Sequence, residues 1–401
     1  MRRGGEMRVI FYTGKGGSGK SVLSCATALR LATQGYDTLV MSSDPAHTIS
    51  DAFERPVGSA PTKIVEHLHA IQVDALREVR EKYGVIQEYV VSVFKARGLD
   101  EVLAYEIASL PNMTEFAAML KIVDFVDAYD VVVLDTVPSG EMLKNIYLPA
   151  ILGSIAPKLL RLVAPFTSVA KLAEPIVGVP APSKEVIAED LRLIETLRRL
   201  KDIILDRDVT SLRLVANPEA FSLQNLKRTY MLASLYNINV DLAIMNKVIP
   251  EDVKDPYFDV WKEEQRKYLE EAERAFYPLP VRRVRLYREE VKGLELLAEV
   301  ADELFGDEDP AKIFFKGKAL SVSETEKGLE IVVPLPFARS EFCEVERIGG
   351  ELSVVVSTEI GEVRNFIPLP TAAWLMRLER AKLLNGELHI FFVRENDDGK
   401  K

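Results

Sequence analysis

The sequence predicts an α/β protein: a doubly wound, mostly parallel sheet with a helical subdomain, followed by a small antiparallel β-sandwich. The first observation is that short, continuous apolar runs alternate with helix-length segments over about the first 300 residues, as in parallel sheets buried on both faces. The second is that the end of the chain changes to short strands separated by frequent turn residues, which is typical of a sandwich. The predicted parallel strands are Arg8–Tyr12, Thr38–Ser42, Val131–Asp135, Leu212–Ala216 and Asp241–Met245.

The domain boundaries are predicted where this pattern changes. The ranges are 1–306 for the α/β domain, 307–317 for a linker, 318–395 for the β-sandwich and 396–401 for a tail. The helical subdomain is expected at about 80–130 and 146–195, and a helical pattern continues from Asp255 to Phe305. The most apolar stretch, Ile146–Ser183, is interrupted by prolines and charged residues, so it favours short amphipathic helices over a transmembrane helix.

Composition and charge exclude several classes of protein. Lys and Arg number 51 and Asp and Glu number 61, a net charge of −10, which argues against nucleic-acid binding because that needs clustered positive charge. Cys25 and Cys343 are the only cysteines and the four histidines are scattered, so neither a disulfide framework nor a zinc site is expected. The first residues lead into a glycine-rich loop without a signal-peptide core, and we expect a cytoplasmic protein.

A phosphate-binding loop is predicted where the first strand meets the first helix. Residues 14–21, GKGGSGKS, fit the pattern GxxxxGK[ST] in this strand–loop–helix context. Backbone N–H groups of such a loop surround phosphate oxygens, and the helix N-terminus adds partial positive charge. Lys20 is expected to reach the β- and γ-phosphates and the Ser21 hydroxyl to bind Mg²⁺. A glycine-rich turn without a ligand is the alternative.

Lys15 directly follows the first glycine of the loop, where an ordinary phosphate loop needs no lysine. Its side chain is free to project outward and could cross to the phosphates of a second subunit. It would then stabilise the charge that develops in phosphoryl transfer, as an arginine finger does. A solvated surface lysine is the alternative.

Two aspartates follow predicted strands. Asp44 follows TLVMS, and Asp135 ends Val131–Asp135. Ligands of open parallel sheets lie at the carboxyl ends of the strands, which is the edge that carries the phosphate loop. Asp135 suits Mg²⁺ binding through a water, and Asp44 suits orienting or deprotonating the attacking water. Each aspartate alone could instead be a helix N-cap.

Three segments, KGGSGKS, SSDPAHTISDAF (42–53) and LDTVPSGEMLKNIYLP (134–149), together resemble the ArsA family of deviant-Walker ATPases over roughly residues 7–305. That family includes the arsenite-pump ATPase and the ATPase that guides tail-anchored membrane proteins. The resemblance implies that Asp44 serves the hydrolytic water, that Lys15 acts across a homodimer, and that Asp135 and Thr136 close on the γ-phosphate. The chain departs from the family at Ser139–Leu143, where SGEML replaces the usual TGHTLR, so the resemblance does not carry over the details of the second switch.

Asn246 and Lys247 follow another predicted strand, in the position of the base-reading motif of GTPases, but Ile249 replaces its aspartate. Guanine would leave its N1–H and N2–H₂ donors unpaired there, so ATP is expected to be preferred. The resemblance implies that Asn246 pairs with adenine, and an incidental strand-end asparagine is the alternative. The predicted sites are: catalytic, Asp44, Lys15 and Lys20; ATP-binding, Gly14, Lys15, Gly16, Gly17, Ser18, Gly19, Lys20, Ser21, Thr136 and Asn246; and magnesium, Ser21 and, through water, Asp135.

The function predicted from these residues is a Mg²⁺-dependent ATPase that cycles as a homodimer and couples ATP to a hydrophobic polypeptide client, such as a tail-anchored membrane protein. The apolar segments 83–94, 117–125 and 146–179 could line a client groove, although core helices are an equal alternative. Targeting such a client would bring transient contact with a membrane or a membrane receptor. Targeting ATPases of the family typically pair through a CxxC zinc clasp, which this chain lacks, so its dimer would be zinc-free.

Two alternatives remain. An arsenite-pump-driving subunit would need several converging thiolates, and the two cysteines argue against it. A partition or positioning ATPase would show a basic patch or a terminal amphipathic helix, but the chain ends in a β-domain.

Residues 381–390, AKLLNGELHI, resemble the α-crystallin signature of small heat-shock proteins, with an Asn-Gly hairpin turn. An unrelated sandwich is the alternative for this domain.

Overall fold

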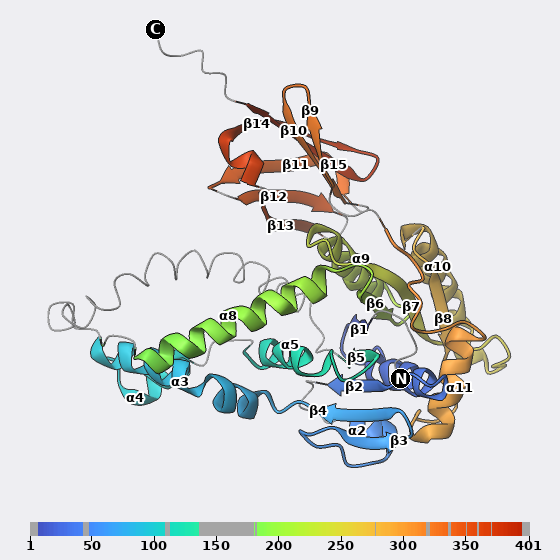
Figure 1. Ribbon diagram of the computed structural model, residues 1–401. Helices are drawn as coiled ribbons and strands as arrows, with labels where there is room; N and C mark the ends of the chain where they lie inside the picture. The colour runs from blue at the N-terminus through green and yellow to red at the C-terminus, as the bar shows by residue number, and fades with distance from the viewer. Residues whose placement is uncertain are drawn as a thin grey trace, which may run out of the picture.

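The computed structural model describes residues 7–42, 48–108, 113–135, 180, 183–276, 278–317, 321–335, 338–349, 351–358, 361–369 and 371–394. Its larger unit is built on an eight-stranded sheet with the order β3-β4-β2-β5-β1-β6-β7-β8 (Figure 1). All neighbours in this sheet pair in parallel except β3 with β4. The strands are β1 (Arg8–Gly14), β2 (Thr38–Ser42), β3 (Thr62–Val65), β4 (Leu68–Gln72), β5 (Val131–Asp135), β6 (Thr210–Ala216), β7 (Val240–Val248) and β8 (Val281–Arg285).

Helices cover both faces of this sheet, because successive strand residues point to opposite sides. In β1, Val9 and Phe11 belong to one apolar core, and Ile10 and Tyr12 belong to the other. The first core is shared with α5 (Met113–Phe125), α8 (Lys184–Leu205), α9 (Ala220–Leu235) and α10 (Asp259–Phe276). The second is shared with α1 (Lys20–Thr33), α2 (Thr48–Phe53) and α11 (Gly293–Phe305). The predicted doubly wound sheet is confirmed.

The helical subdomain is formed by α3 (Ala75–Ala96), α4 (Glu101–Ala108), α5 and α8, which extend from one side of the sheet (Figure 1). The Asp74 side chain caps α3 by accepting from the Arg77 amide, and Ser183 caps α8 by accepting from the Val186 amide. Residues 136–179, which hold much of the predicted groove, lie outside the described residues. No described helix is long and apolar enough to cross a membrane.

One part of the sequence prediction is wrong. The segment from Asp255 to Phe305 is not continuously helical, because η2 (Pro256–Phe258) and α10 are followed by the edge strand β8, which pairs in parallel with β7. Pro278 and Pro280 end the helical pattern before it. The sequence VRRVR of β8 is rich in arginine because this strand lies at the sheet edge and is only partly buried.

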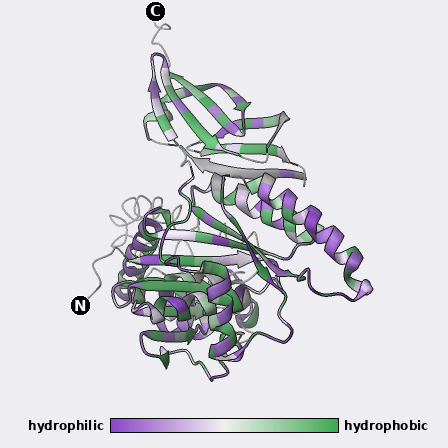
Figure 2. Ribbon diagram, turned by 90° about the vertical axis from the view of Figure 1, so that its right-hand side faces the viewer, coloured by the Kyte–Doolittle hydropathy of each residue, from purple (hydrophilic) through white to green (hydrophobic). Residues whose placement is uncertain are grey.

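The C-terminal unit is a sandwich of two antiparallel sheets, β14-β15-β10-β9 and β11-β12-β13, and confirms that prediction. Its strands mix polar and apolar residues along their length (Figure 2). The turn Asn385-Gly386 joins β14 to β15 with both residues at positive φ (51° and 75°), as the Asn-Gly pair predicts. The elements are β9 (Ser321–Thr325), β10 (Gly328–Pro334), β11 (Ala338–Ile348), β12 (Glu351–Thr358), β13 (Gly361–Pro368), η3 (Thr371–Leu375), β14 (Met376–Leu384) and β15 (Glu387–Arg394).

Residues 306–317, which connect the two units, are bound closely to the amino-terminal edge of the central sheet. Arg213 Nη2 donates to the Pro310 carbonyl at 2.6 Å, and Arg8 Nε donates to the Ala311 carbonyl at 2.8 Å. Arg213 is fully buried and also contacts Asp241 (3.4 Å). Phe314 packs on the second core, with the Arg282 guanidinium 4.3 Å from its ring centre. This segment, called the strap below, therefore completes the packing of the sheet.

Candidate nucleotide site

The phosphate loop turns between β1 and α1, and glycine is required at two of its positions. A Cβ on Gly14 would lie 2.0 Å from the Val215 carbonyl oxygen of β6. Gly19 has a φ of +91°, and a Cβ there would lie 2.2 Å from Asn246 Nδ2. The loop is therefore fitted closely between the carboxyl ends of β6 and β7, at the edge where ligands of parallel sheets bind.

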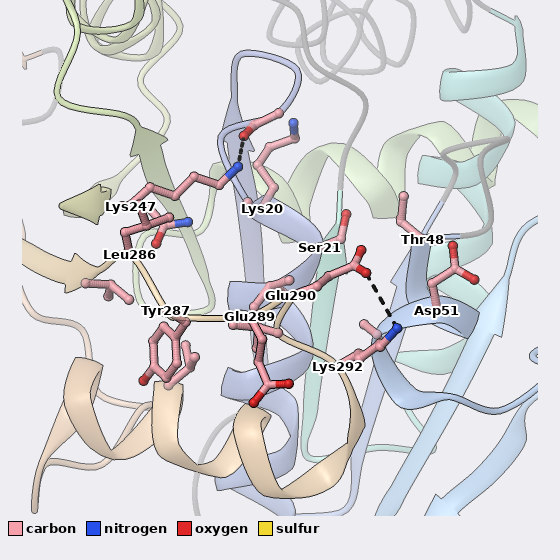
Figure 3. A pocket seen from close by; sticks show the side chains of 18 of the residues that line it. Lys20, Ser21, Thr48, Asp51, Lys247, Leu286, Tyr287, Glu289, Glu290 and Lys292 are labelled. Carbon is pink, nitrogen blue, oxygen red and sulfur yellow. Dashed lines mark hydrogen bonds and ion pairs between the residues drawn. The ribbon is translucent and has the colours of Figure 1, made fainter. Parts of the chain in front are cut away.

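The end of β7 supports the loop through two side chains. Asn246 Nδ2 donates to the Ser18 carbonyl at 2.8 Å. Lys247 Nζ donates to the Gly17 carbonyl at 2.8 Å (Figure 3). Asn246 is buried and Lys247 is exposed. Because the Asn246 amide nitrogen is used by the loop, its Oδ1 is the atom left to accept from an adenine amino group, and base recognition by Asn246 stays a prediction.

The two lysines of the loop diverge. Lys20 is buried, and its Nζ donates to the Lys15 carbonyl at 3.3 Å, close to the loop backbone that would bind phosphate. The Lys15 side chain is exposed and runs the other way, with Nζ 4.3 Å from the ring centre of Phe221 at the start of α9. Lys20 is thus placed for the phosphates of its own chain, and Lys15 is not.

Asp135 ends β5 in the same site and is almost fully buried. Its Oδ2 accepts from Ser42 Oγ and from Thr48 Oγ1, both at 3.2 Å. Burial raises the pKa of the Asp135 carboxyl, whereas the Ser21 hydroxyl and the positive charge of Lys20 oppose the rise. Asp135 Oδ1 is buried and has no hydrogen-bond partner among the described groups.

These residues fit the predicted magnesium ion. A buried carboxylate oxygen without a partner, beside a serine hydroxyl, supplies the oxygen donors that Mg²⁺ prefers, and one or two protein oxygens with several waters are its usual set. Ser21 and Asp135 are therefore the residues that would hold it.

A cavity of about 1240 Å³ opens in front of the loop. Lys20 and Ser21 line one side, and the segment 284–292, which comprises the end of β8 and the connection to α11, lines the other (Figure 3). Leu286 and Tyr287 present an apolar surface there, and Glu290 lies 3.6 Å from Lys292. The volume exceeds that of a typical ligand pocket and accommodates a nucleoside triphosphate.

Segment 284–292 was missed by the sequence analysis, because its residues fell within the range expected to be helical. The sequence feature that could have indicated this strand and the loop after it is VRRVR, a short run rich in valine and arginine, followed by Leu286-Tyr287.

The structure brings together Gly14–Ser21, Asp135 and Asn246, as the sequence predicts for one site. Asp44, Thr136 and the departing segment Ser139–Leu143 lie outside the described residues. Ser42 and Thr48, on either side of Asp44, both donate to Asp135, so residues flanking Asp44 on both sides belong to the site.

The two cysteines lie in different units of the structure. Cys25 is fully buried in α1, where burial raises the pKa of its thiol well above the usual value. Cys343 is half-buried in β11, and burial raises its pKa as well. Within the described residues, no group of three or more His, Cys, Asp or Glu side chains is arranged to hold a metal ion.

The sheet order, the phosphate loop and the cavity define a P-loop ATPase with an appended β-sandwich. The family model described as an anion-transporting ATPase (ArsA ATPase) matches residues 7–306, and the model of the HSP20-like domain found in ArsA matches residues 326–392. The chain therefore belongs to the ArsA ATPase family, as its motifs suggest, and is an ATP hydrolase.

Relatives match along most of the chain. A protein of Prosthecochloris vibrioformis named as an arsenical pump-driving ATPase is 35% identical over 396 residues, covering 97% of this chain and 96% of the relative. A protein of Aquifex aeolicus with the same type of name is 33% identical over 401 residues, covering 96% of this chain and all of the relative. The ATPase get3 of Sclerotinia sclerotiorum is 29% identical over 309 residues, covering 75% of this chain and 90% of the relative.

Proposed function

We propose that this ATPase works in the cytoplasm as a Mg²⁺-dependent homodimer that couples ATP binding and hydrolysis to the binding or targeting of a hydrophobic polypeptide, such as a tail-anchored membrane protein. The observation that carries the homodimer is the position of Lys15. Its side chain leaves the cavity of its own chain, so it needs a second chain to bring phosphates to it.

The roles of the described residues follow from their positions. The loop amides and Lys20 bind the phosphates, and Asn246 and Lys247 hold the loop in shape through its carbonyl oxygens. Ser21 and Asp135 would hold the magnesium ion, which supplies neutralisation of negative charge on the β- and γ-phosphate oxygens when bound. Asp44 is proposed to orient or deprotonate the attacking water, and Thr136 to close on the γ-phosphate.

The helical subdomain supports a hydrophobic client. Val102 on α4 is 73% exposed and Leu191 on α8 is 53% exposed, and Leu103 and Tyr105 of α4 are exposed beside them in sequence. Large apolar side chains exposed on one subdomain are typical of an interaction surface rather than of a core. The similarity to the ATPase named get3 favours the same interpretation.

The test traps the client on a hydrolysis-deficient protein. Asp44→Asn, purified with Mg²⁺ and ATP from cells, is expected to retain membrane proteins that carry a C-terminal apolar segment, identified by mass spectrometry. Lys20→Ala, which should not bind ATP, is the matched control and should retain none. Equal recovery on both variants would contradict a client coupled to nucleotide state.

A second candidate is an arsenite-stimulated pump-driving ATPase, favoured by the names of two relatives that match along most of the chain. The chain has only Cys25 and Cys343, one fully buried and one half-buried, whereas a metalloid site needs converging thiolates. Arsenite is therefore expected to leave the ATPase rate unchanged. Stimulation that is lost in a Cys25→Ser/Cys343→Ser variant would establish the second candidate instead.

A further inference from the structure

The described partner of the Lys15 ammonium is an aromatic ring. Lys15 Nζ lies 4.3 Å from the ring centre of Phe221, and the Phe221 side chain is 65% exposed. Within the part of the chain that the structure describes, no carboxylate forms an ion pair with Lys15, and Phe221 makes no other ring contact. The open face of the Phe221 ring, beside the phosphate loop, is available to a cation, and the Lys15 ammonium covers it.

Both sides of this contact are fixed by the backbone. The loop is held against β6, since Gly14 pairs with Val215 and leaves no space for a Cβ. The start of α9 is fastened to the end of the same strand, because the Asn217 amide donates to Ser222 Oγ at 3.1 Å and the Glu219 amide donates to the Asn217 carbonyl at 2.8 Å. Phe221 is thereby presented beside Lys15, independently of any ligand.

The contact competes with the proposed role of Lys15, because one ammonium group cannot lie on the Phe221 ring and at the phosphates of a second chain at the same time. We propose that Phe221 is a positioning residue that seats Lys15 in the unpaired chain and releases it when two chains meet. This inference rests on the proposed homodimer with Lys15 acting across it. This contact between Lys15 and Phe221, called the seat below, would hold Lys15 away from phosphates in the unpaired chain. Pairing of two chains would then be the step that starts hydrolysis.

The cation–π contact between Lys15 and Phe221 is weak. Both partners are exposed, no described carboxylate adds charge, and the N-terminus of α9 carries partial positive charge that disfavours a cation. An exposed cation–π contact changes an equilibrium by about two- to fivefold, and a homodimer releases one such contact from each chain, so dimerisation changes by about four- to twenty-five-fold. The contact therefore shifts the protein concentration at which pairing occurs without preventing pairing.

The test measures ATPase rate per subunit against protein concentration at saturating Mg²⁺ and ATP. Phe221→Leu keeps an apolar side chain of similar size and removes the aromatic face in both chains, so the half-maximal concentration is expected to fall by about four- to twenty-five-fold. Phe221→Tyr retains the ring and should behave as the natural protein. Gln224→Ala, exposed on the same helix, is the control for a general effect on α9.

Other outcomes overturn the proposal. A higher half-maximal concentration for Phe221→Leu would make Phe221 an interface contact, and an unchanged one would mean that the seat has no effect. A lower maximal rate at saturating protein would place Phe221 in the paired site itself.

The effect must also depend on Lys15. In sedimentation with Mg²⁺ and ATP, Lys15→Ala and Lys15→Ala/Phe221→Leu are expected to dimerise equally, and a difference between them would contradict a seat for Lys15. If Lys15→Ala alone hydrolyses ATP at the natural rate, the proposed function fails. If it is inactive and Phe221→Leu still does not shift the midpoint, only the seat fails.

Discussion

The two edges of the central sheet differ in how their buried polar groups are paired. At the carboxyl edge, Asp135 Oδ1 and Ser18 Oγ are buried without a partner in the described structure, although the large majority of buried side-chain polar atoms are paired. At the amino edge, the buried guanidinium groups of Arg8 and Arg213 each donate to a strap carbonyl. Arg8 also donates to Ser211, and Arg213 donates to Asp241 and Tyr12. Arg207 Nε, just before β6, is an exception, since it is buried without a partner among the described groups.

This difference distinguishes buried polar groups that stabilise the fold from buried polar groups that are placed to bind a ligand. At the amino edge the chain itself supplies partners for the Arg8 and Arg213 guanidinium groups, so burial of charge there holds the strap in place. At the carboxyl edge the buried oxygens of Asp135 and Ser18 can take partners from a ligand, which would offset the cost of burying them unpaired. The predictions below remove a group from one edge or the other.

The largest effect is expected at the carboxyl edge. Lys15→Ala should lower the ATPase rate by on the order of 10³-fold, as for the loss of an arginine finger, while nucleotide binding stays near its natural affinity. Lys20→Ala should instead weaken nucleotide binding itself, because Lys20 points into the site. Steady-state turnover and binding of a fluorescent ATP analogue separate the two variants.

Mixing two inactive variants tests whether Lys15 of one subunit acts on the nucleotide of the other. Lys15→Ala combined with Asp44→Asn should regain part of the activity, because a mixed dimer holds one site with both an intact Asp44 and an intact Lys15 from the other chain. Natural turnover by Lys15→Ala alone would exclude the lysine from catalysis.

The next effect is expected at the amino edge. A chain ending after Asp309 loses the Pro310 and Ala311 carbonyls, which leaves Arg213 Nη2 and Arg8 Nε without these acceptors. A chain ending after Gly317 keeps the strap. The shorter chain should be less stable to urea by about 2–5 kcal/mol, the cost of leaving buried charged donors unpaired.

The longer truncation is the matched control, and it should still bind and hydrolyse ATP. Equal unfolding midpoints for the two truncations would mean that the strap contributes nothing to the α/β domain. Loss of nucleotide binding in both would make the two domains one cooperative unit.

The sequence predicts most of the sheet because its strands are buried on both faces and are therefore continuously apolar. β2 and β5 have the predicted bounds, and β1, β6 and β7 extend the predicted runs by a few residues. The edge strands β3 and β8 do not follow this pattern, since Lys63 of β3 and Arg283 and Arg285 of β8 are exposed. The packing of the strap could not be predicted either, because it depends on buried arginines from β1 and β6, two strands that pair in the sheet but are far apart in the sequence.

The loop could be predicted because its residues are consecutive, so spacing alone identifies them. The wall formed by 284–292 could not, because it reaches the loop only through the pairing of β8 with β7. The contact of Lys15 with Phe221 likewise joins residues 206 positions apart (221 − 15) through the pairing of β1 with β6.

A third prediction concerns the base. The Ile249 amide donates to Gln265 Oε1 at 2.9 Å and its carbonyl accepts from Gln265 Nε2 at 2.8 Å, so the backbone that follows Asn246 is already paired. With no carboxylate at this position, ATP should be preferred over GTP by several-fold to about a hundredfold in kcat/KM. Ile249→Asp should narrow the preference. Equal use of ATP and GTP by the natural protein would show that the base does not meet this strand end.

The smallest effect is expected from the two side chains that support the loop. Asn246 and Lys247 each donate to a loop carbonyl at 2.8 Å, but Asn246 is buried and Lys247 is exposed. Water can replace the hydrogen bond of the exposed Lys247 ammonium. Asn246→Ala instead leaves the Ser18 carbonyl without its hydrogen-bond partner and opens a small cavity beside Gly19. Asn246→Ala should weaken ATP binding by about five- to tenfold and Lys247→Ala by about twofold or less, measured by calorimetry with Mg²⁺. If Lys247→Ala proves the more damaging change, its charge acts on the phosphates directly, and the carboxyl edge then holds a third phosphate-binding lysine besides Lys15 and Lys20.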